Sequence, residues 1–208
     1  PAGEKEFIDE RLILIDRLTE EPESQPWPPH PPVQAARYRP WVSPRIADRL
    51  EAGGDTLLAE VRPVVAMFVQ LEDVFGDSDF SDGAELNEYI AFVQRIVSEL
   101  EGDLITLTVG DKGNSLYIVF GATTAHEDDE QRAVRAAMQL RSPPREIALG
   151  RNARPGSSTG EMRVGTYGDA ARRAYDIQGL EVNLANRLMT NAGPGEILVS
   201  DHVAQRVS

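Results

Sequence analysis

The chain has 208 residues and a formal net charge of −13, and 41% of its residues are hydrophobic. This length suits one domain with extensions, and the apolar share is enough for a buried core. An acidic surface repels phosphate backbones, so we expect no nucleic-acid partner. The chain has no cysteine and no apolar run near the ~20 residues of a membrane span, which predicts no disulfide, no membrane insertion and a cytoplasmic location.

The first 44 residues are predicted to be an N-terminal helix followed by a proline-rich linker or arm. Residues 4–20 have the pattern of an amphipathic helix, which either packs on its own domain or binds a partner. Residues 21–44 hold eight of the 14 prolines, which favours an extended segment. The aromatic residues expected to anchor this arm are Trp27, Tyr38 and Trp41. Both chain ends look like cuts from a longer polypeptide.

A compact domain, truncated at its C-terminal end, is predicted over residues 45–208. Its first elements are a short helix over 44–53, a buried strand over 61–71, a helix over 84–101, two hairpin strands over 103–109 and 115–121, and a helix over 127–141. Next come strands over 145–153 and 161–168, separated by a flexible stretch over 153–160. A strand over 174–178, a helix over 179–193 and a strand over 196–200 complete the pattern.

This order of elements contains the split strand–helix–strand unit of ferredoxin-like folds. It predicts an α+β domain with an antiparallel-rich sheet and helices packed on one face. The acidic loop between the first strand and its helix could suggest calcium, but it lacks the periodic ligand spacing of a calcium loop. A solvated loop is therefore favoured for Glu72, Asp73, Asp77, Asp79 and Asp82.

Three stretches make the sequence resemble the class III nucleotidyl cyclases. They are VVAMFVQLEDVF at 64–75, the hairpin and helix at 107–140, and the segment at 162–200 that contains YDIQGLEVNLANR. The GDKG turn and the HEDD run are most similar to the second cyclase half of soluble-adenylyl-cyclase-type multidomain proteins. The resemblance implies a half of a composite site that pairs with a second cyclase half. That site would convert ATP to cyclic AMP and pyrophosphate with Mg²⁺ or Mn²⁺.

Two polar residues in the third stretch are the candidate catalytic pair. Asn183 and Arg187 are four residues apart on a predicted helix, so their side chains project from one face. An amide can orient a ribose, and the guanidinium fork matches phosphate oxygens. From spacing alone, a cap-like bond of Asn183 and a surface ion pair of Arg187 are an alternative.

Asp176 is the candidate nucleotide-binding residue, at the position where the resemblance implies an acid that accepts a hydrogen bond from the adenine amino group. A carboxylate accepts from an amine and repels a carbonyl, so it would favour adenine over guanine. The alternative is a surface acid at a strand end.

The metal-binding pattern of the family is incomplete in this sequence. Gln70 stands where the family has its first metal-binding aspartate, and an amide lacks the charge that a hard cation prefers. Asp111 matches the second aspartate and is a weak metal candidate, so the ligands are expected mainly from the partner half. Leu107 occupies the family's base-selecting lysine position. Lys112 is more simply a solvated turn residue, and His126 is assigned no chemistry.

The sequence leaves two main hypotheses about function, and a third is kept as an alternative. The chain is either an enzyme half that is inactive alone, or a non-catalytic regulatory half that binds a nucleotide or only its partner. A ferredoxin-like interaction module unrelated to nucleotides is the third.

Overall fold

The computed structural model describes residues 3–7, 10–14, 23, 25, 26, 28, 34–52, 59–71, 83–109, 113–147, 149–168 and 173–208. The chain divides into two compact units, Pro1–Gln34 and Ala35–Ser208. The larger unit contains the sheet and the helices around it.

The first unit contains a two-stranded antiparallel hairpin. Strand β1 (Gly3–Phe7) pairs with β2 (Glu10–Leu14), and Gly3 lies opposite Leu14. The helix predicted over residues 4–20 is therefore wrong for the described part of that range. A helix without a packed apolar face has little to stabilise it in water, and here the backbone groups that face each other across the two strands pair instead.

The second unit opens with three short helical elements, α1 (Ala35–Tyr38), η1 (Arg39–Trp41) and α2 (Pro44–Glu51). The predicted helix near residue 44 is confirmed. Trp41 is 88% exposed, so the prediction that its ring anchors the arm is wrong. The guanidinium of Arg39 holds η1 and α2 together instead, because it bonds to the carboxylates of Asp48 and Glu51. Trp27 lies outside the described residues.

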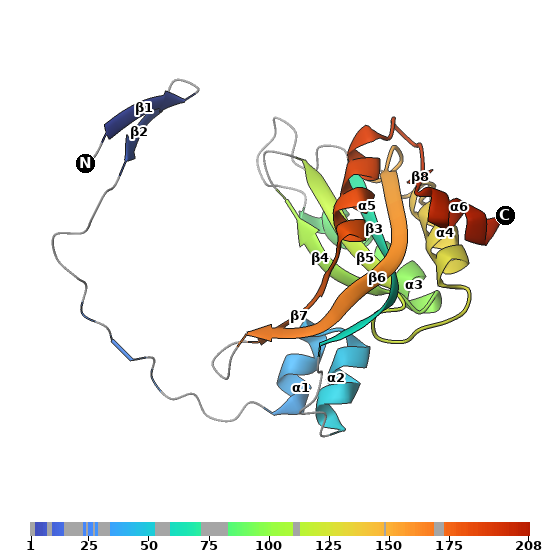
Figure 1. Cartoon of the computed structure of the whole chain (residues 1–208), viewed down its shortest axis with the longest axis horizontal. Helices are drawn as coiled ribbons and strands as arrows, with labels where there is room; N and C mark the ends of the chain where they lie inside the picture. Colours follow the sequence, from blue (N-terminus) through green and yellow to red (C-terminus); the bar gives the residue numbers. More distant parts are fainter. Residues whose placement is uncertain are drawn as a thin grey trace. The chain divides into compact units, whose positions relative to one another are not determined.

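The main sheet has six strands in the order β4-β5-β3-β6-β7, with β8 paired to β6 (Figure 1). Every described pairing in it is antiparallel except that of β6 with β8. The antiparallel-rich sheet is confirmed. Its strands are β3 (Glu60–Leu71), β4 (Asp103–Thr108), β5 (Asn114–Phe120), β6 (Arg154–Gly168), β7 (Arg173–Gln178) and β8 (Leu198–Val199).

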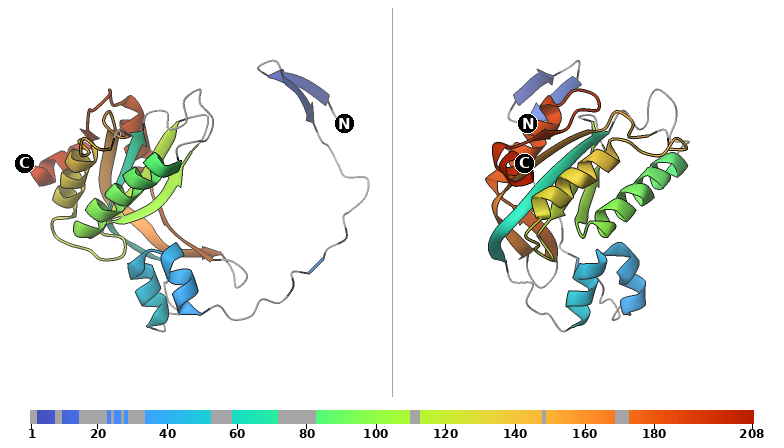
Figure 2. Two further views of the ribbon diagram at one scale, coloured as in Figure 1. Left: turned by 180° about the vertical axis from the view of Figure 1, so that it is seen from behind. Right: turned by 90° about the vertical axis from the view of Figure 1, so that its right-hand side faces the viewer.

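Helices cover both faces of this sheet (Figure 2). On one face, α3 (Gly83–Glu99) and α4 (Asp129–Leu140) pack on a core that includes Val65 and Met67 of β3. On the other face, α5 (Leu180–Asn191) packs on a second cluster that includes Val64 and Ala66. A short helix, α6 (Asp201–Val207), follows β8.

The prediction of helices on one face is therefore wrong for α5. The central strand explains this, because β3 presents buried apolar side chains on both of its faces between Val64 and Val69. A strand of this kind needs a covering layer on each side.

The stretch predicted to be flexible, residues 153–160, is the first half of β6. Within 145–153, the described residues 145–147 and 149–153 form no strand, so the predicted strand there is wrong. Gly156 and Ser158 lie buried in the middle of the sheet. Small residues belong here because α5 lies directly above them: a Cβ at Gly156 would be 2.1 Å from the Met189 nitrogen.

Gly156→Ala is expected to destabilise the domain by about 2 kcal/mol or more, because the added methyl would meet the backbone of α5 and force the helix away from the sheet. Urea unfolding followed by circular dichroism measures this. Gly83→Ala is the matched control, since nothing lies within 4 Å of a Cβ there. It should be neutral or stabilising by up to about 1 kcal/mol. Equal stabilities of the two variants would contradict the close packing.

Candidate functional site

The helix that carries the candidate catalytic pair is locked to the sheet through its inner face. Ala185 and Met189 are buried, and Gly156 leaves room for their backbone. At the first turn, the carboxylate of Glu181 accepts a hydrogen bond from the buried Ser158 hydroxyl of β6. These contacts fix both the height of α5 above the sheet and its rotation about its own axis.

This rotation turns Asn183 and Arg187 away from the sheet. Both side chains are exposed, whereas Ala185 between them is fully buried. In the described part of the chain, the bond recorded for Arg187 is made by its backbone carbonyl, which accepts from Asn191. Neither the cap-like bond of Asn183 nor the surface ion pair of Arg187 is found there. Both side chains therefore lie on the outer surface of α5.

Asp176 lies on β7, opposite Gly165 of β6, and is half-buried. One of its carboxylate oxygens accepts a hydrogen bond from the Ile177 nitrogen at 2.8 Å. Its charge acts on Tyr117: burial raises the pKa of the Tyr117 hydroxyl, and the negative charge of Asp176 raises it further. The carboxylate therefore lies within electrostatic reach of the cluster beneath α5.

A row of side chains runs along β3 and β5 on the α5 face. The Phe68 and Tyr117 rings stack with centroids 4.5 Å apart and an interplanar angle of 5°. Two residues after Phe68, the half-buried Gln70 lies on the same face and pairs with Ser115 in register. Its amide nitrogen would be 2.9 Å from a Cβ at Gly113, so this amide fills the space beside the hairpin.

The described residues of this chain do not fit a pair of metal ions. Among them, no group of three or more His, Cys, Asp or Glu side chains could hold a metal ion. Gln70 offers a neutral oxygen where a hard cation favours a carboxylate. Asp111 and Lys112 lie outside the described residues, as does the acidic loop.

Leu107 lies on the other side of the sheet. It packs against the core under α3 and α4, next to its partner Leu116. The position therefore contributes to stability, and its side chain has no access to the face that carries α5.

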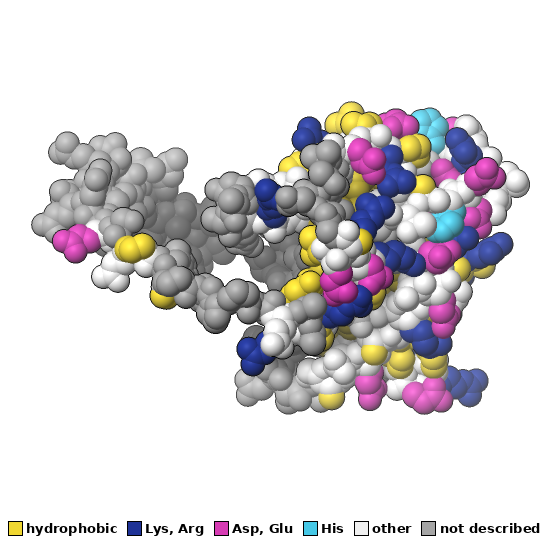
Figure 3. All heavy atoms as spheres, turned by 90° about the horizontal axis from the view of Figure 1, so that it is seen from below, with side chains coloured by type: hydrophobic (Ala, Val, Ile, Leu, Met, Phe, Trp, Pro, Cys, Tyr) yellow, Lys and Arg dark blue, Asp and Glu magenta, His cyan; other side chains and the backbone are white. Residues whose placement is uncertain are grey.

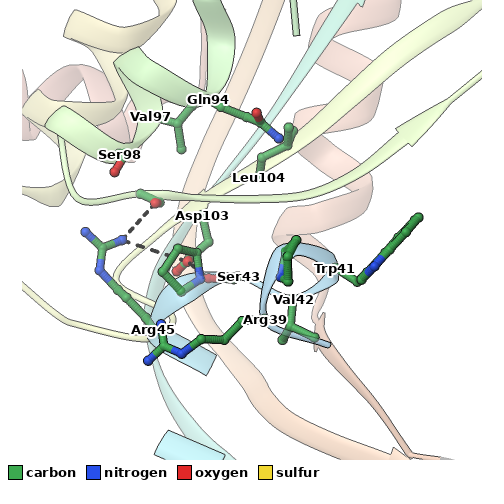
Figure 4. Close-up of a pocket in the computed structure, with 13 residues that line it drawn as sticks. Arg39, Trp41, Val42, Ser43, Arg45, Gln94, Val97, Ser98, Asp103 and Leu104 are labelled. Carbon is green, nitrogen blue, oxygen red and sulfur yellow. Dashed lines mark hydrogen bonds and ion pairs between the residues drawn. The ribbon is translucent and has the colours of Figure 1, made fainter. Parts of the chain in front are cut away.

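Figure 4 shows a cavity of about 510 Å³ whose lining residues include neither Asn183 nor Arg187. It opens between η1, α2, the end of α3 and the start of β4. Asp103, 5% exposed, accepts hydrogen bonds from Ser43 at 2.8 Å and Thr123 at 2.5 Å, and Arg45 donates to the Gly102 carbonyl. The Trp41 ring points away from these groups. This arrangement ties the N-terminal helices to the domain.

The His126 ring lies between two carboxylates. Its ring nitrogens lie 3.0 Å from Glu101 and 3.2 Å from Asp129, and Arg132 bonds to Glu101 and Asp128. The Arg132 guanidinium lowers the pKa of Asp128. These groups close the turn between α3 and β4 against the start of α4.

The face in Figure 3 shows acidic and basic side chains interspersed. Within the described residues, no helix combines the length and the apolar character that crossing a membrane requires.

Residues 63–208 match the family described as the adenylate and guanylate cyclase catalytic domain. This match covers more than half of the chain, and the chain belongs to that family. Human adenylate cyclase type 10 is 28% identical over 135 residues, and its rat counterpart is 27% identical over 135 residues. Each alignment covers 64% of this chain and 8% of the relative, so the chain spans a small part of these proteins.

Solved structures show the same fold. The guanylyl cyclase Cya2 superposes with a TM-score of 0.60 at 22% identity, over 72% of this chain and 80% of that one. The adenylyl cyclase CyaB from P. aeruginosa gives 0.57 at 23% identity, over 72% and 82%. The predicted family and fold are confirmed. Catalytic domains of this family bind a nucleotide and work in pairs, generally with Mg²⁺ or Mn²⁺.

The Ser158–Glu181 bond should stabilise the attachment of α5 measurably. In a double-mutant cycle of Ser158→Ala and Glu181→Ala, we expect a coupling free energy of about 1 kcal/mol or more, because the bond is part-buried and involves a charged acceptor. Urea unfolding of the four proteins measures it. The exposed Asp201–Gln205 pair on α6 is the control cycle, with an expected coupling of about 0.5 kcal/mol or less. Equal coupling in both cycles would contradict an anchoring role.

Proposed function

We propose that this chain is one half of a composite nucleotidyl cyclase site that converts ATP to cyclic AMP and pyrophosphate. The observation that carries the proposal is the outward projection of Asn183 and Arg187 from a helix whose inner face is fully engaged. Side chains that point away from their own sheet can act on a nucleotide only if another surface holds it against them. A second cyclase half would supply that surface.

Arg187 and Asn183 have distinct roles in this proposal. The ribose 3′-oxygen attacks the α-phosphorus, the 3′-oxygen–phosphorus bond forms, and the bond to the bridging oxygen of the β-phosphate breaks. Pyrophosphate leaves, and the 3′-hydroxyl proton passes to solvent or a base. The Arg187 guanidinium faces the negative charge that grows on the phosphate oxygens, and the Asn183 amide orients the ribose.

The metal ions of the reaction would be held by the partner half. Metal ions activate the hydroxyl and stabilise the leaving phosphates when they are bound. This chain has an amide at Gln70 where the charged ligand is needed, so we assign it no metal-dependent step. The proposal thus requires a partner that carries both metal-binding aspartates.

Asp176 is assigned to the base. Its carboxylate would accept a hydrogen bond from the exocyclic amine of adenine, and guanine presents a carbonyl at that atom. This polarity supports ATP as the substrate.

A second candidate function is a regulatory half that binds a nucleotide, or only its partner, without turnover. Gln70 favours it directly, because the same position would be charged in a half that holds metal. A metal-dependent assay of the reconstituted pair separates the two candidates. Absence of any nucleotide-induced thermal shift, even with the partner, would instead favour a plain interaction module.

The isolated chain is expected to make no cyclic AMP with Mg²⁺ or Mn²⁺. A homodimer would repeat Gln70 in both of its sites, so neither would hold the metal ions that activate the hydroxyl. Mass spectrometry of the product, over a range of chain concentrations, measures this. Cyclic AMP that rises with chain concentration and disappears in Arg187→Ala would refute the expectation. Reconstitution with a half that carries both aspartates should restore turnover.

Arg187→Ala in the reconstituted pair should lower turnover about 100-fold while weakening ATP binding much less. A guanidinium aimed at transition-state charge contributes on the order of 3 kcal/mol to the barrier. Steady-state kinetics give turnover, and equilibrium dialysis gives affinity. Arg135→Ala, which removes an exposed arginine from α4 on the other face, is the control and should change neither. Unchanged turnover in Arg187→Ala would make the residue purely structural.

A further inference from the structure

The outer side of α5 carries two exposed leucines. Leu180 is 84% exposed and Leu184 is 39% exposed. The elements that α5 packs against most are β6, β3 and β8, which all belong to the sheet beneath the helix (Figure 2). Within the described residues, apolar surface on the side of α5 that faces away from the sheet is therefore left uncovered.

These leucines share one stripe of the helix with the proposed catalytic pair. Four side chains of α5 follow the spacing i, i+3, i+4, i+7, which places them on the same side of a helix: Leu180, Asn183, Leu184 and Arg187. The fully buried Ala185 lies on the opposite side. A surface that covers the polar pair must therefore also cover the two leucines.

The grouping on α5 is what makes these two leucines informative. The other exposed large hydrophobic side chains among the described residues stand singly on separate elements: Trp41, Leu50, Val61, Val109 and Met138. Single exposed apolar residues are normal on a soluble protein, whereas apolar residues grouped on one face beside functional groups indicate an interaction site.

We propose that Leu180 and Leu184 are the apolar contacts through which this chain binds the second cyclase half. This inference rests on the proposed function and deepens it, because it states the chemistry of the partner's facing surface. Catalytic domains of this family work in pairs, and the leucines are continuous with the residues that need the partner. Apolar side chains stabilise a complex by leaving water, so the partner presents a hydrophobic patch to the first two turns of α5.

The stripe thus separates two tasks. The leucines contribute to the affinity between the halves, and Arg187 contributes to turnover once the halves are together. Leu180 has more surface left to bury than Leu184, so its contribution to affinity is the larger one. It is also the first residue of α5 and is mostly exposed, so its truncation leaves the fold of the domain intact.

Leu180→Ala and Leu184→Ala test the proposal. Each chain is mixed with a separately purified half that carries both metal-binding aspartates, and sedimentation velocity gives the dissociation constant of the pair. We expect Leu180→Ala to weaken pairing about tenfold and Leu184→Ala about threefold. Turnover at saturating partner should be retained, and the melting temperature of Leu180→Ala alone should be unchanged. Arg187→Ala should show the reverse, with pairing unchanged and turnover lowered.

Met138→Ala is the matched control, because Met138 is a 53% exposed apolar residue of α4 on the other face of the sheet. It should leave the affinity of the pair unchanged. Wild-type affinity in a chain that carries both leucine substitutions would overturn the proposal. So would leucine-dependent self-association of the chain without binding to the other half, since the occupant would then be a second copy. If the leucines control pairing but the pair makes no cyclic AMP, the cyclase function fails and the surface stands.

Discussion

The arrangement of the site depends on the close approach of two backbones, that of α5 and that of β6. At Gly156 there is no room for a side chain, since a Cβ would be 2.6 Å from the Ala185 carbonyl oxygen. The helix therefore has one available height and, with Ala185 and Met189 turned inward, one available rotation. Asn183 and Arg187 are held outward as a result. A larger residue in β6 would move the proposed catalytic pair without touching it.

The core on one face of the sheet stabilises the domain, whereas the helix that carries the proposed catalytic pair covers the other face. Under α3 and α4, the core contains large, fully buried side chains such as Phe120 and Ile96, and this face needs no ligand to be complete. Under α5, the cluster is smaller and is bordered by polar groups at Tyr117 and Gln70. Packed cores are rigid, so the first face can act as the scaffold that positions the second.

Much of the fold could be predicted from periodicity, and its failures have physical causes. The apolar run of β3 and the spacing of α4 and α5 predicted those elements. Residues 153–160 were misread because glycine and serine are typical of loops, and only the helix above them explains their place in a sheet. Asn183, Arg187 and Asp176 were predicted as site residues because the motif around them has fixed spacing, and their roles remain a prediction.

The positions of Gln70 and Arg187 suggest how a chain that lacks a charged metal ligand could still contribute to a pair of cyclase halves. Gln70 lies on β3, whereas Arg187 lies on α5, so metal binding and phosphate binding belong to separate elements. In the proposed head-to-tail pair, the α5 helix of each half would face the β3 strand of the other. One junction would then combine Arg187 with the partner's aspartates, and the other would combine the partner's helix with Gln70. Under this proposal, loss of the charge at Gln70 disables one of the two sites and leaves the other intact, so each pair would have a single active centre.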